Sequence, residues 1–418
     1  MSHIPHLLLQ LAVILATARV LALVLGRLGQ PPVIGEMMAG IVLGPLVFGA
    51  LAPEANAWVF PREKLAALEG LSQVGLVLFM FVVGAELRAP AGARERFVAA
   101  GWVGSLGVLL PMLLGLAIAP ALHARFAPAG VAFWPFALFM AASMAITAFP
   151  VMARILKERA LTKSPLGQLA LASAAIADAF VWIMLALVVA LISAHGGWGE
   201  FVRCVVGLFA MAAVGFGGLR PLIAKLLARH AADGRPGGAV LSVLVIGTCV
   251  MAAATEWLGL HPVFGAFLFG VCLPRDDRLL ATLIERIEHV AVLVLMPVFF
   301  ALAGLSTTTD AFTGTGLPAL LLILAAAVAG KILGAGGGAR IAGLGWREAG
   351  AVGSLMNARG LMELIVMKVG LDAGVIGFEI FTMLMVMAIV TTLMATPMLT
   401  WFARGTAATD AIEGREPF

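Results

Sequence analysis

One carboxylate stands inside a long apolar stretch of this sequence, and it is the first group that could do chemistry. Asp178 lies in ALASAAIADAFVWIMLALVVALI, within an apolar run from about Leu166 to Ile192. A charged side chain at the centre of a bilayer costs about 2.5–3.5 kcal/mol even on insertion scales. Chains keep such a group because it binds an ion or a proton, or because it pairs with a neighbouring helix. We expect Asp178 to bind an ion, and structural pairing is the alternative.

Two hydroxyl side chains could add oxygen ligands, which hard cations prefer. Thr147 lies in ITAFP, where Pro150 removes a helical hydrogen bond and frees main-chain carbonyls near Phe149. Ser173 comes five residues before Asp178, about 140° from it around a helix, so it is the weaker candidate. The predicted ligands of a monovalent metal ion, Na⁺ or K⁺, are therefore Asp178, Thr147 and Ser173.

A second polar group interrupts the apolar segment 345–369. The sequence SLMNARG places Asn357, Arg359 and Gly360 at bilayer depth, and Glu363 follows four residues after Arg359. This spacing lets the two charges pair on one face of a helix. Snorkelling of the arginine to the surface is the alternative, but Arg359 stands near the centre of the segment. We expect the pair to support a broken helix and not to contact a substrate.

The two interruptions, one in ITAFP and one in SLMNARG, lie about 209 residues apart. Half-helix ends carry partial charges that can face an ion or a fixed counter-charge. Paired interrupted helices in the two halves of a chain indicate the binding site of a transporter. A proline kink that serves only packing is the alternative for the first interruption.

Membrane-spanning helices must position these residues. Of the 418 residues, 62% are hydrophobic and 12% are charged, whereas about 25% are charged in soluble domains. Apolar runs long enough to span a bilayer recur along the whole chain. We predict an all-α polytopic membrane protein with about 13 transmembrane helices, at roughly 5–26, 33–50, 70–86, 97–119, 131–156, 166–193, 201–227, 238–257, 261–273, 287–304, 317–338, 345–369 and 376–402.

The sequence disfavours several other functions. Cys204, Cys249 and Cys272 are far apart and odd in number, so we expect neither a disulfide framework nor a cysteine metal site. No GxSxG or HExxH motif and no pair of catalytic acids occurs, so we expect no enzyme and no cofactor. The net charge of +4 comes from short loops and does not indicate nucleic-acid binding. The glycine-rich stretch 334–343 lacks the GK[ST] of a phosphate loop, and we expect it to let helices pack closely.

The basic residues predict an orientation in the membrane. The loops between spans 1–2, 3–4, 5–6, 7–8, 9–10 and 11–12, with the C-terminus, hold about 19 Lys or Arg. The opposite loops hold about five, namely Arg62, Lys64, Arg125, Arg203 and Lys368. The basic side is cytoplasmic by the positive-inside rule, which places the N-terminus outside and a short tail, 403–418, inside.

An internal repeat links the two halves of the chain. The run LGQPPVIG at 28–35, followed by Gly40, is echoed at an offset of 230 by LGLHPVFG at 258–265, followed by Gly270. A second echo, at an offset of 220, relates Gly84 to Gly304 with a phenylalanine five residues before each. Because the matching spans lie seven apart, they must cross the membrane in opposite directions. We therefore predict an inverted repeat of spans 1–6 and 8–13, as is typical of secondary transporters.

Five segments carry a resemblance to a known family. They are PPVIGEMMAGIVLGP (31–45), ITAFPVMARIL (146–156), AIADAFVWIMLAL (175–187), GLHPVFGAFLFG (259–270) and GSLMNARGLMELIV (353–366). Their order and content closely resemble the second family of monovalent cation:proton antiporters, which includes bacterial sodium/proton exchangers, potassium-efflux systems and plant cation/proton exchangers. The resemblance covers about residues 5–402.

The resemblance implies a homodimer whose protomers each have two parts. It places a mobile ion-carrying core at about 97–193 and 317–402, with two broken helices that cross. It places a scaffold with the dimer interface at about 5–86 and 201–304. The core would move against the scaffold and expose the ion site to each side of the bilayer in turn.

The resemblance also assigns roles to residues. The family's ion-binding carboxylate corresponds to Asp178, and its basic residue on the preceding helix of the second half corresponds to Lys331. Many electrogenic members have two adjacent acids, but this sequence has Ala177 before Asp178. One carboxylate exchanges one cation for one proton without net charge, so we expect electroneutral exchange of Na⁺ or K⁺ for H⁺.

Two other transport functions remain as alternatives: a gated potassium-efflux pathway similar to a channel, and an organic-anion symporter of similar fold. A channel would be expected to show a selectivity filter, and the sequence shows none. For an antiporter we expect multi-pass insertion in the cell inner membrane, with the lipid bilayer, a monovalent cation, protons and a second copy of the chain as partners.

Overall fold

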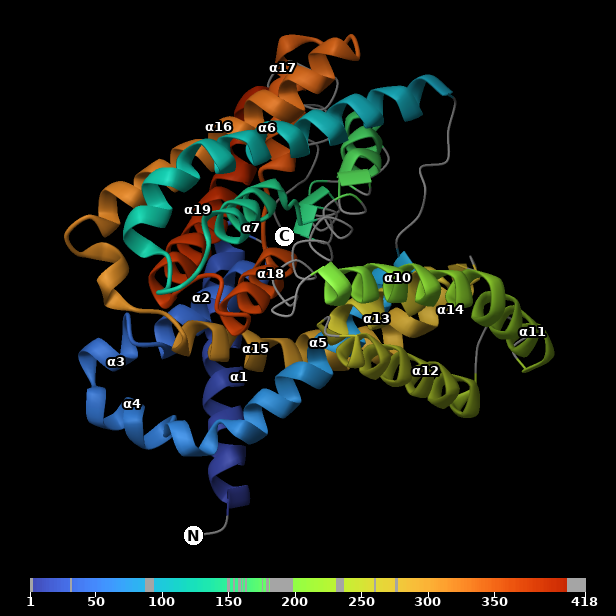
Figure 1. The fold of residues 1–418 in the computed structure, drawn as a ribbon, viewed down its shortest axis with the longest axis horizontal. Coiled ribbons are helices and arrows are strands. Elements are labelled where there is room, and N and C mark those ends of the chain that lie inside the picture. The colour runs from blue at the N-terminus through green and yellow to red at the C-terminus, as the bar shows by residue number, and fades with distance from the viewer. Residues whose placement is uncertain are drawn as a thin grey trace. The chain divides into compact units, whose positions relative to one another are not determined.

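The computed structural model describes residues 3–30, 32–86, 94–148, 151–152, 155–156, 159, 161, 164–174, 176–177, 180, 198–230, 237–258, 261–274 and 277–403. Over these ranges the regular secondary structure is helical and no strand occurs (Figure 1). Within the described residues, nine helices are long and apolar enough to cross a membrane, and Phe133–Ala145 and Pro262–Val271 are shorter apolar helices. The all-α polytopic prediction is confirmed, whereas the count of about 13 spans is not.

Contacts along the chain divide it into two compact units. The first unit comprises 1–16, 52–88 and 189–302, and the second comprises 17–51, 89–188 and 303–418. Every residue that the sequence nominates for the site belongs to the second unit. The division into a moving core and a scaffold stays a prediction.

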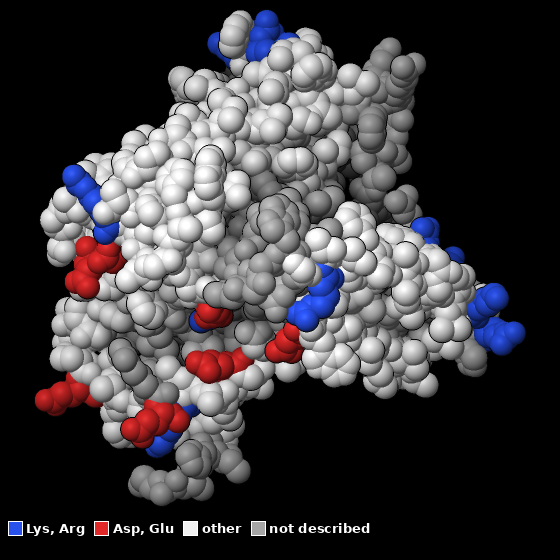
Figure 2. All heavy atoms as spheres, in the orientation of Figure 1, with Lys and Arg blue, Asp and Glu red and all other residues white. Residues whose placement is uncertain are grey.

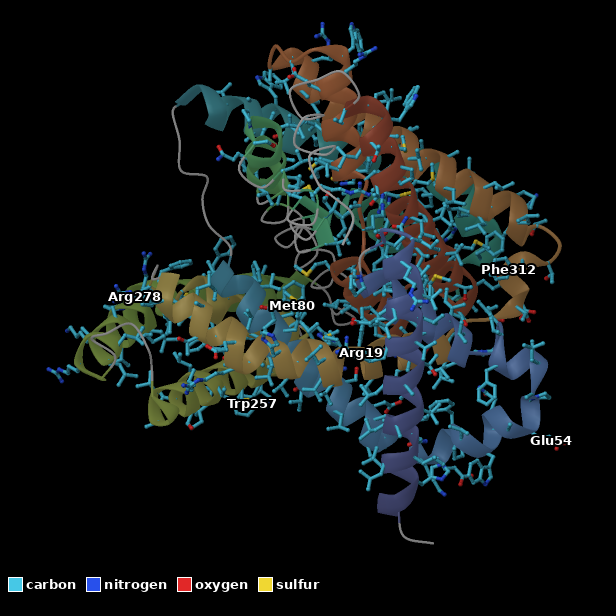
Figure 3. The ribbon with its side chains drawn as sticks, turned by 180° about the vertical axis from the view of Figure 1, so that it is seen from behind. Arg19, Glu54, Met80, Trp257, Arg278 and Phe312 are labelled. Carbon is cyan, nitrogen blue, oxygen red and sulfur yellow. The ribbon has the colours of Figure 1, made fainter. Side chains whose placement is uncertain are left out.

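The first unit contains the start of α1 (His3–Arg27) and most of α15 (Met296–Leu305). Between them lie α4 (Pro53–Val59), α5 (Ala66–Glu86), α10 (Trp198–Val214), α11 (Arg220–His230), α12 (Gly238–Trp257), α13 (Pro262–Val271) and α14 (Asp277–Leu283), with the short helical turns η1 (Arg62–Lys64), η2 (Gly215–Leu219), η3 (Ile284–Glu288) and η4 (Ala291–Leu295). Met80 of α5 is buried, whereas Trp257 at the end of α12 is 86% exposed (Figure 3). An exposed tryptophan at a helix end is typical of the interface between lipid and water.

The second unit contains the end of α1, followed by α2 (Pro32–Leu43) and α3 (Phe48–Leu51). It continues with α6 (Arg94–Phe126), α7 (Phe133–Ala145), the short turn η5 (Thr309–Phe312), α16 (Gly316–Ile341), α17 (Trp346–Met356), α18 (Leu361–Asp372) and α19 (Phe378–Ala403). Wide areas without charged side chains are visible in Figure 2. A surface of this kind suits contact with lipid.

Glycines let α6 and α16 pack with their backbones in contact. A Cβ atom on Gly334 would overlap the carbonyl of Leu106, and one on Gly338 would lie 2.5 Å from the carbonyl oxygen of Trp102. Two helices can approach this closely only where one presents glycine. The prediction that the glycine-rich stretch serves helix packing is confirmed.

The internal repeat recurs as a pair of equivalent helix crossings. In the second unit, a Cβ atom on Gly304 of α15 would overlap the backbone of Gly40 in α2. In the first unit, a Cβ atom on Gly84 of α5 would lie 3.1 Å from Cα of Gly270 in α13. The offsets of 230 and 220 convert one pair into the other. The repeat found in the sequence therefore describes the same contact made twice.

Candidate ion-binding site

Both predicted interruptions are present in the structure. Helix α7 ends at Ala145, and Ile146 is extended, with φ −62° and ψ 140°. Residues 146–148 are not helical, and helical residues occur again at 151–152. In the second half, residues 357–360 separate α17 from α18. Phe149 and Pro150 lie outside the described residues.

The two interruptions touch each other. The main-chain nitrogen of Ala148 donates a hydrogen bond to the carbonyl oxygen of Ala358 at 3.1 Å. A Cβ atom on Gly360 would lie 2.7 Å from a methyl carbon of Val151, so only glycine leaves room for the first segment there. Each interruption thus satisfies part of the backbone that the other leaves without a helical partner.

Lys331 of α16 is completely buried and reaches the first interruption. Its ammonium group donates to the carbonyl oxygen of Ala145 at 2.5 Å, to the hydroxyl of Thr147 at 2.6 Å and to the carbonyl oxygen of Gly107 at 3.0 Å. A buried ammonium requires acceptors of this kind because it has left water. The residue that the resemblance assigns as the basic residue therefore contacts a predicted ion ligand.

Arg359 is also completely buried, and it reaches the same helix end from the second interruption. Its guanidinium donates to the carbonyl oxygens of Ser143 at 3.0 Å and Met144 at 2.8 Å. It also donates to a carboxylate oxygen of Glu363 at 2.7 Å. The pairing that the i,i+4 spacing predicts is thus present.

Two fixed cations converge on the C-terminal end of α7. Arg359 binds the carbonyls of Ser143 and Met144, and Lys331 binds the carbonyl of Ala145. The last carbonyls of a helix carry a partial negative charge of about half an electron and need partners outside the helix. The site is therefore built on a helix end whose negative potential is already compensated before any ion enters.

The carboxylate of Glu363 lies near the start of α18, where the helix dipole favours a negative charge. Its second oxygen has no hydrogen-bond partner within the described part of the chain. Asn357 is buried, and its amide nitrogen donates to a main-chain carbonyl of α19 at 3.4 Å. Thus Asn357, Arg359, Gly360 and Glu363 all lie at the second interruption.

The predicted ligands fare differently. Thr147 is buried at the first interruption, where its hydroxyl accepts the hydrogen bond from Lys331. Ser173 is buried too, but its hydroxyl donates to the carbonyl of Leu169 in its own helical turn at 2.7 Å. Asp178 lies outside the described residues, and its role as ion ligand stays a prediction. Its neighbour Ala177 is buried.

Sequence reasoning did not find two polar residues that touch this site. Ser143 offers its carbonyl to Arg359, and its buried hydroxyl has no partner among the residues that the structure describes. Thr392 of α19 bonds to the backbone of Arg359. Threonines are common in transmembrane helices, so neither its type nor its spacing distinguishes Thr392 from Thr391.

Comparison with known proteins identifies the family. A family described as sodium/hydrogen exchanger, transmembrane, matches residues 12–405. The chain belongs to this family. It is therefore an integral, multi-pass membrane protein, in agreement with its many membrane-spanning helices.

Relatives match along most of the chain. A Na⁺/H⁺ antiporter of Synechocystis, NhaS4, is 37% identical over 398 residues, covering 94% of this chain and 96% of the relative. Cation/H⁺ antiporter 17 of Arabidopsis thaliana is 36% identical over 95% of this chain and 48% of its own length. K⁺/H⁺ antiporter 1 of Saccharomyces cerevisiae is 33% identical over 95% of this chain and 46% of its own length. The chain spans about half the length of the plant and yeast relatives.

A solved structure shares the fold. The sodium proton antiporter MjNhaP1 of Methanocaldococcus jannaschii has a TM-score of 0.55 and 15% sequence identity, covering 98% of this chain and 100% of that chain. At this identity the similarity establishes the fold of the backbone alone.

Proposed function

We propose that this protein is a secondary active antiporter that exchanges a monovalent cation, Na⁺ or K⁺, for H⁺ by alternating access. The observation that carries the proposal is the convergence of Lys331 and Arg359 on the end of α7, beside the crossing of Ala148 and Ala358. Interrupted helices that cross at a charge-compensated point are the arrangement by which transporters bind ions within the bilayer. The names of the relatives, Na⁺/H⁺ and K⁺/H⁺ antiporters, support the same function.

The chemistry needs one carboxylate that holds either a proton or a cation. In the proposal Asp178 is that group, and Thr147 with nearby main-chain carbonyls supplies further oxygen ligands. The ion displaces the proton on one side of the membrane, and the proton displaces the ion on the other. Competition for one site couples the two fluxes without a cofactor and without an enzymatic step.

The proposed stoichiometry is one cation for one proton. Ala177 stands where many electrogenic relatives have a second acid, and an alanine side chain cannot titrate. A single carboxylate is neutral when protonated and neutral when loaded with a monovalent cation. No net charge then crosses the membrane in a cycle.

We also propose the setting in which exchange occurs. The protein resides in the cell inner membrane as a homodimer, with its N-terminus outside and its C-terminus in the cytoplasm. The excess of Lys and Arg in alternate loops supports this orientation. The ion-carrying core comprises about residues 97–193 and 317–402, and it moves against the scaffold.

The test uses purified protein in liposomes that contain a pH-sensitive dye. Pulses of Li⁺, Na⁺, K⁺ and Rb⁺ are applied in turn, and we expect at least one of Na⁺ and K⁺ to drive proton movement. Cation flux without proton counterflow would instead indicate a channel. Proton flux driven only by an organic anion would indicate a symporter.

A further inference from the structure

The extended backbone at 357–360 has few helical partners, so other groups must satisfy it. Ala358 offers its carbonyl to Ala148, and the carbonyl of Gly360 accepts from Glu363 in the first turn of α18. Between them, the N–H and C=O of Arg359 lie in neither helix. Buried main-chain groups of this kind are nearly always hydrogen-bonded, because leaving one unpaired costs about 1–3 kcal/mol.

The side chain of Thr392 holds both of these groups. Its hydroxyl oxygen accepts a hydrogen bond from the main-chain nitrogen of Arg359 at 2.9 Å. The single hydroxyl proton can go to the carbonyl oxygen of Arg359 or to that of Ala388, each at 2.7 Å. Thr392 is completely buried, so water does not compete for these bonds.

We propose that Thr392 is a positioning residue for the ion site, which deepens the function proposed above and rests on it. By fixing the main chain of Arg359, the hydroxyl fixes the direction in which the guanidinium leaves the backbone. The guanidinium in turn holds the carbonyls of Ser143 and Met144 at the end of α7. Three residues after Met144 comes Thr147, whose oxygen is a proposed cation ligand.

The chain of contacts therefore runs from α19 through Arg359 to the ligand segment. A displacement of a tenth of a nanometre in a binding group is enough to change affinity substantially. Thr392 does not contact the ion in this scheme, so its loss changes how tightly a cation binds and leaves the proton-carrying group in place.

Thr391 is the matched control. It is the preceding residue on α19, it is equally buried, and its hydroxyl donates to Met387 and Ala388 of its own helix at 2.8 and 3.1 Å. Replacing either threonine with valine removes a hydroxyl and keeps the volume nearly constant. The two substitutions differ in which bonds they remove.

The experiment measures the apparent KM for Na⁺ and for K⁺, with kcat, in the liposome assay for the unmodified protein, Thr392→Val and Thr391→Val. We expect Thr392→Val to raise the KM of the transported cation about threefold to tenfold, the effect of losing one or two buried hydrogen bonds. Thr391→Val should keep the KM of the unmodified protein. Equal KM values for the two valine variants would overturn the proposal.

A second pair of variants covers the case in which Thr392→Val does not fold. Thr392→Ser and Thr392→Ala both lose the methyl group and differ in the hydroxyl alone. We expect the serine variant to keep a KM close to that of the unmodified protein and the alanine variant to show the raised value. A common KM for both would overturn the positioning role, whereas no exchange by the unmodified protein would refute the proposed function itself.

Discussion

The ammonium nitrogen of Lys331 lies 2.6 Å from the hydroxyl oxygen of Thr147. This oxygen is also a proposed ligand of the transported cation. A hydroxyl oxygen has two lone pairs, so it can accept from Lys331 and still offer one lone pair to a metal ion. Two positive charges would then share one oxygen and repel each other. The affinity of the site for a cation therefore depends on the position and charge of Lys331.

The first prediction concerns Lys331→Ala. The substitution leaves the acceptors at Gly107, Ala145 and Thr147 without their donor, at about 1–3 kcal/mol for each buried acceptor that stays unpaired. We expect lower thermal stability in detergent and slower exchange, with residual exchange retained because the carboxylate remains. The control Lys368→Ala removes a partly exposed ammonium and should change stability by less than about 1 kcal/mol. Complete loss of exchange in a folded Lys331→Ala protein would assign Lys331 to proton coupling.

The second prediction concerns Asp178→Asn. Asparagine keeps the shape of the side chain but binds neither a proton nor a cation as a carboxylate does, so exchange should vanish while the protein still folds. The liposome assay and size-exclusion chromatography measure the two properties separately. Near-normal proton-coupled flux in Asp178→Asn would disprove the assignment of the ion-binding group.

The third prediction compares two ion pairs on α18 with the same i,i+4 spacing. The pair of Arg359 and Glu363 is completely buried, whereas the side chains of Lys368 and Asp372 are 28% and 44% exposed. Glu363→Gln leaves a buried guanidinium without its counter-charge, which costs about 3–5 kcal/mol. Asp372→Asn breaks an exposed pair and costs about 0–1 kcal/mol. Thermal unfolding of the two variants in the same detergent tests the difference, and equal losses would contradict the burial of the first pair.

The fourth prediction concerns the equivalent crossings. Gly304→Ala and Gly270→Ala both place a methyl group against the backbone of a partner helix, so we expect both to destabilise the protein by about 1–3 kcal/mol. Gly337→Ala on α16 is the control, because nothing lies within 4 Å of the added atom. It should be neutral or stabilising by up to about 1 kcal/mol. Tolerance of alanine at either crossing would refute the close approach there.

The fifth prediction concerns membrane voltage. If one cation exchanges for one proton, potentials clamped with valinomycin leave the rate of Na⁺-driven exchange unchanged, with a protonophore control for leaks. An exchanger that moved one net charge would gain or lose about 2.3 kcal/mol for each 100 mV. A clear dependence on potential in the unmodified protein would overturn electroneutral exchange and make Lys331 or Glu363 the next candidate for a second titrating group.

Much of this arrangement could be predicted from the sequence because the bilayer restricts the possibilities. Apolar length identifies membrane spans, and an Arg or a Pro in the middle of one marks an interruption. The spacing of Arg359 and Glu363 gave their pairing, since residues four apart share a helix face. The position of Lys331 came from the family resemblance, and the structure adds its three acceptors.

The remaining features depend on contacts between distant segments, which local patterns do not reveal. Nothing in the spacing of Ala148 and Ala358 indicates that their backbones meet. Thr391 and Thr392 are identical residues with adjacent numbers, and only the rotation of α19 decides which hydroxyl reaches Arg359. Ser173 shows the same limit, because its hydroxyl is used within its own helix.

The hydrogen bond between Ala148 and Ala358 has a consequence for biosynthesis. The two residues are separated by 210 positions (358 minus 148), so a ribosome adding about 5–20 residues each second needs roughly 10–40 s to make the second after the first. During that interval the end of α7 has neither Lys331 nor Arg359 to bind its carbonyls. The nascent chain must therefore shelter an unfinished helix end by means of water, lipid headgroups or an insertion factor until the last third of the protein has entered the membrane.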